Sequence, residues 1–275
     1  MVLTSGRAKF KMATFQRWRR KSSSETQRCS VKIDGLVAPQ VCCRLTSELL
    51  KYLLYERQQI PLPYEQIKFD LKRDETVRQE TKDKGVTPVV KRSKSLFPSS
   101  ERKRCKHVVD CMEELLPHLE DLFSLTFVPQ VLILIGATAV SPKEAYIINF
   151  TDALTTSKEN SLSAKSCIRS LLREMVTKDF LPISSMPPIT NTILLVKAHR
   201  DCGLEWFVPK LTYKLGSRGQ QYDITLAGTA HPGGEQVRIE EQGPKDDYIW
   251  YQAPLSIKGY KEKSVRAAKP EDIWI

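Results

Sequence analysis

The sequence predicts an α+β domain with a mostly antiparallel sheet, and not a doubly wound fold. Three segments with helical apolar spacing fall in the first two thirds of the chain. Short apolar runs typical of strands lie between them and dominate the last third, where glycine and proline separate them. A hydrophobic content of 41% over 275 residues is enough for a large core. This order, with strands gathered late, favours α+β architecture.

The chain begins with a basic segment that we expect to be a disordered arm over residues 1–35. Residues 1–28 hold eight Lys and Arg against one acid, a net charge of +7, and show no sustained apolar period. Such segments bury too little apolar surface to fold by themselves. Residues 68–106 carry a further +7, which leaves −3 for the rest of the chain. The expected folded domain, residues 36–260, is therefore near neutral outside this second basic segment.

Residues 41–59, "VCCRLTSELLKYLLYERQQ", predict the first helix. Apolar side chains at helical spacing form one stripe, and others lie on the opposite side: Val41, Leu45, Leu49 and Tyr52 against Leu50 and Leu54. A helix that is apolar on two sides is buried on both. Pro61 and Pro63 end it. The charged stretch that follows, 70–104, is predicted to be a mobile basic loop.

A second helix is predicted around residues 108–123, with a kink or break at Pro117. "VPQVLILIGA" and "EAYIINF" then predict two strands, the first of them buried. The third helix is predicted over 161–180, with serines that can cap its start. Four strand candidates follow, "NTILLVKAH", "WFVPKLTYKL", "YDITLAG" and "DYIWYQAPLSIKGY", and a flexible tail is expected over 261–275.

The apolar side chains of the third helix cover an arc of about 180°, wider than the stripe of a little over 100° that a surface helix needs. One edge, Leu172 with Val176, is therefore expected to stay exposed beside Arg169 and Arg173. Exposed apolar patches with a polar rim mark surfaces for protein partners. A helix buried more deeply than average would explain the same pattern.

No catalytic constellation is found in the sequence. His199, Arg200 and Asp201 reproduce a tripeptide of protein kinases, but the asparagine, the Asp-Phe-Gly and the glycine loop that a kinase needs are all missing. Neither a phosphate-binding loop nor a nucleophile elbow occurs. His199 and Cys202 give a single metal-ligand spacing without a second pair. We therefore expect a non-catalytic protein with no cofactor and no metal.

The cysteines and the apolar runs indicate a protein of a reducing compartment without a membrane segment. Seven cysteines, an odd number with two adjacent, form no disulfide framework. The longest apolar run, "VLILIGA", is too short to span a bilayer, and no signal peptide is expected at the N-terminus. The basic segments lack a nucleic-acid-binding motif with interleaved aromatics, so nucleic acid is not the partner that we expect.

Several long stretches resemble the comet family, HORMA-like proteins that bind the checkpoint protein Mad-two and silence the mitotic spindle checkpoint. They are "CCRLTSELLKYLLYERQQIPLPYEQIK", "PHLEDLF", "VPQVLILIGATAVSPKE", "HRDCGLEWFVPKLTY" and "DYIWYQAPLSIKGY". The likeness runs in order from Val41 to Tyr260 and leaves out the arm, the basic insertion and the tail. It implies a HORMA-like fold, with three helices on one side of a mainly antiparallel sheet.

The resemblance also implies a function. The protein would be an adaptor that binds closed Mad-two, third helix against third helix, and presents it to a hexameric AAA+ ATPase that remodels it. It would act in the nucleus and cytoplasm, at the mitotic spindle and kinetochore. The ATP chemistry would belong to the ATPase.

Individual positions carry over as follows. Leu172 takes the place of the family's aromatic anchor on the third helix, and Glu56 that of a glutamine contact on the first helix. The implied Mad-two surface comprises Glu56, Ile168, Arg169, Leu172 and Val176. Pro209 and Lys210 match the pair that faces the ATPase. An alternative remains open, a divergent HORMA-like module that holds nucleic acid or chromatin through its basic arm and loop.

Overall fold

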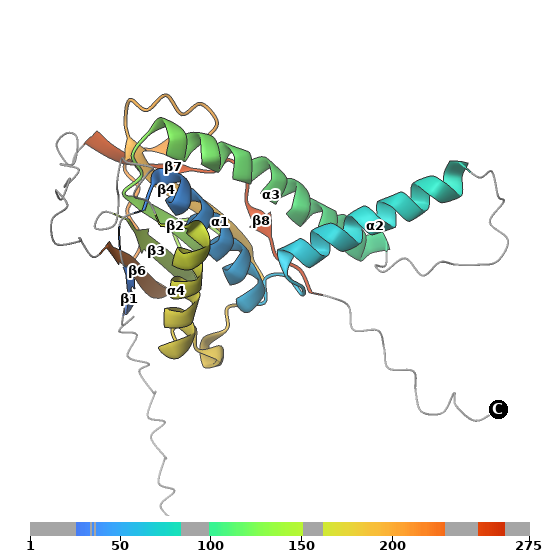
Figure 1. Cartoon of the computed structure of the whole chain (residues 1–275), viewed down its shortest axis with the longest axis horizontal. Helices are drawn as coiled ribbons and strands as arrows, with labels where there is room; N and C mark the ends of the chain where they lie inside the picture. Colours follow the sequence, from blue (N-terminus) through green and yellow to red (C-terminus); the bar gives the residue numbers. More distant parts are fainter. Residues whose placement is uncertain are drawn as a thin grey trace, which may run out of the picture.

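The computed structural model describes residues 26–33, 35, 37–83, 99–150, 162–228 and 247–261. Within these residues the chain forms an α+β fold, with helices against one face of a mixed sheet (Figure 1). The helices are α1 (Pro39–Glu56), α2 (Tyr64–Asp83), α3 (Ser99–Leu125), α4 (Ala164–Thr177) and the short 3-10 helix η1 (Ile183–Ser185). The strands are β1 (Gln27–Ile33), β2 (Gln130–Ile135), β3 (Glu144–Asn149), β4 (Asn191–His199), β5 (Val208–Lys210), β6 (Gln220–Gly228), β7 (Tyr248–Gln252) and β8 (Ile257–Lys258). The predicted α+β class is confirmed.

The sheet has the strand order β1-β6-β3-β2-β4-β7-β5, and β8 pairs with β4. β1 and β3 run parallel to β6, and the other pairs are antiparallel. The mainly antiparallel sheet of the prediction is thus present, with a parallel portion at the β1 edge.

The central strands are buried on both faces. In β2, Val131 and Ile133 belong to the main core under the helices, whereas Leu132 and Leu134 belong to a smaller cluster on the opposite face. The smaller cluster is covered in part by Tyr213, which lies in the segment after β5. Strands buried on both faces read as continuous apolar runs, and the sequence "QVLILI" is of this kind.

The α1 helix is buried on two sides, as its two apolar stripes predict. Leu45 and Leu49 from one stripe and Leu50 and Leu54 from the other are all buried in the main core. The helix ends at Glu56, before the predicted stop at Pro61. It packs against α3 and α4, so it forms the centre of the helical layer (Figure 1).

The prediction of a mobile loop over 70–104 is wrong at both ends. α2 is helical to Asp83, and α3 begins at Ser99. Residues 84–98 lie outside the described part of the chain. Sequence periodicity missed α2 because few of its side chains are apolar. The helix is stabilised instead by contacts with α3, among them an ion pair between Lys68 and Glu113 at 3.0 Å, and by the buried Leu71.

Two further expectations need correction. Residues 27–33 were expected in the disordered arm, but they form β1 and pair along their length with β6. Residues 1–25 of the arm and 262–275 of the tail lie outside the described residues. Of the kink or break predicted at Pro117, the break does not occur, because α3 continues to Leu125. Buried Leu115 and Leu119 hold this part of α3 in the core, and packing offsets the roughly 3 kcal/mol that an internal proline costs.

Candidate partner-binding surfaces

The α4 helix presents one face to the core and the other to solvent. Its buried residues are Cys167, Leu171 and Met175, spaced four apart. Its start is fixed by Ser163, whose hydroxyl accepts a hydrogen bond from the Ser166 amide at 3.3 Å. This is the serine cap that the sequence predicts. Since α4 packs on α1 and β1, its orientation is set by the core.

A groove of about 910 Å³ runs between α1 and the outer side of α4. Its apolar floor includes Ile168 and Leu172, both half-buried, and Val176, which is 70% exposed. The exposed edge predicted for Leu172 and Val176 is thus confirmed for Val176, and Leu172 is partly covered. Arg169 lines the same groove. Four of the five residues predicted for partner binding therefore come together.

Charged side chains surround this apolar floor. The lining includes four cations and one carboxylate: Arg44, Lys165, Arg169, Arg173 and Glu48. Sequence reasoning missed Arg44 and Glu48. The available signal was that both are charged residues within a helix that is otherwise apolar on two sides. Such an apolar floor with a charged rim is the usual anatomy of a protein-binding surface.

Glu56, the fifth residue, lies elsewhere. It is the last residue of α1 and lines a second hollow, of about 490 Å³. Other residues around this hollow include Tyr55, Ile183 and Met186, together with Tyr260 near the described end of the chain. Glu56 therefore does not line the groove that holds Leu172.

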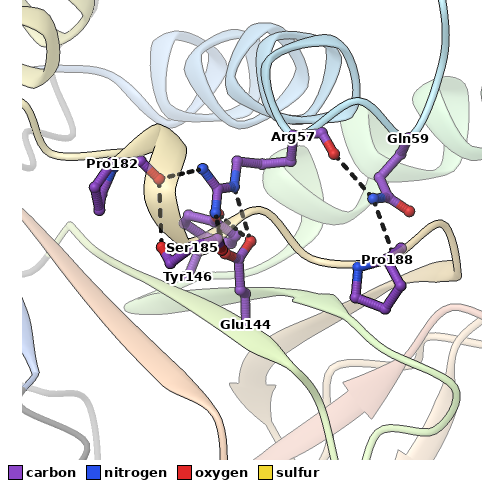
Figure 2. Close-up of polar contacts among 7 residues, drawn as sticks. All are labelled: Arg57, Gln59, Glu144, Tyr146, Pro182, Ser185 and Pro188. Carbon is purple, nitrogen blue, oxygen red and sulfur yellow. Dashed lines mark hydrogen bonds and ion pairs between the residues drawn. The ribbon is translucent and has the colours of Figure 1, made fainter.

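A buried ion pair fixes the chain beside this second hollow. Arg57 and Glu144 are both fully buried, and their side chains form a double contact: Arg57 Nε donates to Glu144 Oε2 at 3.0 Å and Nη2 donates to Oε1 (Figure 2). Arg57 also donates to the carbonyl oxygens of Pro182 at 3.3 Å and Ser185 at 2.8 Å. The end of α1, the start of β3 and the η1 segment are thereby joined.

Tyr146 completes the cluster by donating to Glu144 Oε2 at 2.7 Å. Burial acts to lower the pKa of Arg57, but the hydrogen bonds to Glu144 outweigh it and raise the pKa overall. Burial, together with the Glu144 charge, raises the pKa of Tyr146 well above its usual value. Arg57 and Tyr146 therefore stay protonated at neutral pH, and the cluster is suited to structural support rather than proton transfer. No pattern in the sequence indicated this cluster.

Gln59 extends this support to the end of the domain. Its side chain donates to the carbonyl oxygens of Arg57 at 2.9 Å and Pro188 at 3.3 Å, as Figure 2 shows, and its oxygen accepts from the Thr190 amide at 2.9 Å. The Tyr260 amide donates to the Gln59 carbonyl at 2.8 Å. Residues 57–59 therefore hold both the segment after α4 and the segment after β8.

Pro209 and Lys210 lie on β5, at one edge of the sheet. Among the described strands, β5 pairs only with β7, and Pro209 is opposite Tyr251. Pro209 is exposed, and Lys210 is half-buried. A proline suits an edge strand because its nitrogen has no hydrogen to donate. β1, against which α4 packs, is at the other edge of the sheet, so the two predicted surfaces lie on opposite sides of the domain.

Other kinds of site receive little support from the described residues. They contain no group of three or more side chains that could hold a metal ion, and His199 and Cys202 stay an isolated pair. Burial raises the pKa of the Cys43 thiol to about 12 and also raises that of Cys42, so both are inert core residues. No helix within the described ranges is long and apolar enough to cross a membrane.

Comparison with known proteins decides the family. Residues 17–262 match the p31comet family, which is described as "Mad1 and Cdc20-bound-Mad2 binding". The chain belongs to the p31comet family. The match begins at residue 17, well before Val41, where the resemblance was expected to start. Mad2 is the Mad-two of that resemblance.

Two relatives support the assignment to the p31comet family. The human MAD2L1-binding protein is 38% identical over 232 residues, which cover 84% of this chain and 79% of that protein. The mouse MAD2L1-binding protein is 36% identical over 232 residues, 84% of this chain and 78% of its own length. The p31comet family is one of spindle-checkpoint binding proteins, and membership confirms the expectation of a non-catalytic protein.

Proposed function

We propose that this chain binds the closed, Cdc20-bound form of Mad2 and presents it to a hexameric AAA+ ATPase. Remodelling of Mad2 by the ATPase would then silence the spindle checkpoint. The observation that carries the proposal is the α1–α4 groove, with its exposed Val176 and its charged rim, in a chain of the p31comet family. Mad2 would lie along α4, with Leu172 at the centre of the contact. The protein would act in the nucleus and cytoplasm, at the mitotic spindle and kinetochore.

The contribution of Leu172 is expected from its surroundings. The side chain is half-buried beside Ile168 and Val176, so its neighbours already restrict its movement before any partner arrives. Ordering a side chain on binding costs roughly 0.5–1.5 kcal/mol, and a side chain that is already ordered avoids most of that cost. A carboxylate at position 172 would place charge in the apolar floor and oppose binding.

The first test is size-exclusion chromatography with Mad2 locked closed and, in parallel, Mad2 locked open. We expect co-elution with the closed form only. Leu172→Glu should abolish it, whereas the matched variant Val140→Glu, an exposed apolar residue in the turn between β2 and β3, should not. Failure of the wild-type chain to bind either form would refute the proposal.

The second surface is proposed for the ATPase. Pro209 and Lys210 are at the sheet edge away from α4, so a partner on the α1–α4 groove would leave them accessible. Replacing both with alanine should leave closed Mad2 bound but stop ATP-dependent conversion to the open form. Lys214→Ala, at an exposed lysine four residues beyond Lys210, is the control. Normal conversion by the double variant would contradict this part.

Salt titration separates this function from nucleic-acid binding through the basic segments. Binding that neutralises several phosphates weakens steeply, by a factor of about 10³–10⁵ between 50 and 200 mM salt for six to ten contacts. Binding through an apolar floor with a few rim charges should change far less, since exposed pairs contribute little. Tight, steeply salt-dependent binding to DNA or RNA without Mad2 binding would favour the alternative.

A further inference from the structure

The α1–α4 groove is too small to account for a stable complex by itself. It is lined by ten residues, whereas specific protein interfaces involve about 20–30 residues on each side. A partner seated on the groove must therefore cover neighbouring surface. The question is in which direction the contact continues.

The face of α1 that borders the groove continues to the second hollow. Tyr55 follows Glu48 by seven residues, about two helical turns, so both lie on the same face of the helix. Glu48 lines the groove and Tyr55 lines the hollow. α4 packs against α1, and η1, which follows α4 in the chain, lies against the end of α1. α1 and α4 therefore run in the same direction, and the two hollows follow one another along them.

The second hollow presents unusually exposed apolar side chains. Ile183 on η1 is 76% exposed, and Tyr55 is 43% exposed. Both border the hollow together with the half-buried Met186. Exposed apolar groups that gather at one place on the surface of a soluble protein indicate a binding site.

Ile183 is exposed on a segment that is firmly held. Phe180 and Leu181, just before it, are buried in the core. The carbonyl oxygens on either side, of Pro182 and Ser185, both accept hydrogen bonds from Arg57 (Figure 2). An apolar side chain on a backbone that is already fixed saves the cost of ordering that segment on binding, which suits an interface anchor.

We propose that Tyr55 and Ile183 form a second anchor for closed Mad2, and that the buried Arg57–Glu144 pair positions Ile183 for this contact. The inference rests on the proposed function. The contact would extend from Leu172 and Val176 along α1 to η1, with Glu56 beside the second anchor. Glu56 does not line the groove around Leu172, but on this proposal it belongs to the same interface.

The experiment measures the Kd for locked-closed Mad2 by titration calorimetry. Ile183→Asp and Tyr55→Ala should each raise the Kd by at least about tenfold, as expected for interface anchors. Val140→Asp, whose parent valine is 75% exposed in the turn between β2 and β3, should leave the Kd unchanged. All these side chains are solvent-exposed, so the variants should fold, and thermal unfolding checks this.

Three outcomes are informative. If Leu172→Glu abolishes binding while Ile183→Asp and Tyr55→Ala leave the Kd within about twofold, the second anchor is refuted and the proposed function stands. If the wild-type chain does not bind, the proposed function falls, and the anchor with it. A photo-crosslinking residue at position 183 should couple to Mad2, and the same residue at position 140 should not. The absence of a crosslink at 183 would also count against the anchor.

Discussion

Replacing Arg57 with methionine should lower the free energy of unfolding by about 3–5 kcal/mol, the cost of removing one partner from a buried ion pair. Methionine is apolar and fills much of the same space, so the cavity contribution is small. What remains is the Glu144 carboxylate without its cation, and the Ser185 carbonyl oxygen without the Arg57 donor. The Pro182 carbonyl oxygen also loses Arg57 but still accepts from the Ser185 amide and hydroxyl, both at 3.3 Å. Tyr146 still donates a hydrogen bond to Glu144, and this limits the loss in the free energy of unfolding.

Thermal unfolding followed by circular dichroism measures this effect. A domain of this size loses roughly 2–4 °C in Tm for each kcal/mol, so the variant should melt about 6–20 °C below the wild-type chain. Arg44→Met, at an exposed arginine of α1, is the matched control and should stay within about 0.5 kcal/mol.

A double-mutant cycle tests the reason for the effect. Replacing Glu144 with leucine alone leaves the Arg57 charge buried and should also be costly. The double variant Arg57→Met/Glu144→Leu removes both charges and should cost less than the sum of the two single variants. Additive losses, or a loss below about 1 kcal/mol for Arg57→Met, would refute the claim that this pair joins α1, β3 and η1.

Three more predictions concern stability. Gly219→Ala should destabilise the fold by about 1–3 kcal/mol in urea titrations, because Gly219 has a φ of +93° and an added Cβ would press on the Pro142 carbonyl oxygen; an unchanged midpoint would contradict this. Ser163→Ala should cost about 1 kcal/mol through loss of the α4 cap, and Ser163→Asp should restore stability; equal stability of all three chains would argue against the cap. Burial raises the pKa of Cys43 from 9.0 to about 12 and that of Tyr64 from 10.0 to about 12, and the unfolded chain ionises first. The free energy of unfolding should therefore fall as pH rises above 9.0, and a flat profile up to pH 11 in urea titrations would show that these groups contribute nothing.

Much of the fold could be predicted from local pattern. The two-sided apolar α1, the continuous apolar run of β2 and the wide apolar arc of α4 each follow from spacing alone. The exposure of Val176 also followed, because an arc wider than the core needs leaves one edge outside. Where apolar spacing was weak, prediction failed. α2 is held by contacts with α3, and β1 by pairing with β6, and local apolar spacing indicates neither contact.

The sequence by itself determined the α+β class, the apolar edge of α4 and, through resemblance, the family. Each of these depends on periodicity or on long runs of residues that local physical chemistry or family likeness can interpret. Only the tertiary structure decided that Arg57 is buried against Glu144, that its remaining donors hold η1, and that Glu56 lies apart from Leu172. Arg57 and Glu144 are 87 positions apart. A charged side chain looks the same in a sequence whether it is solvated or buried, and only the folded chain settles which partner it meets.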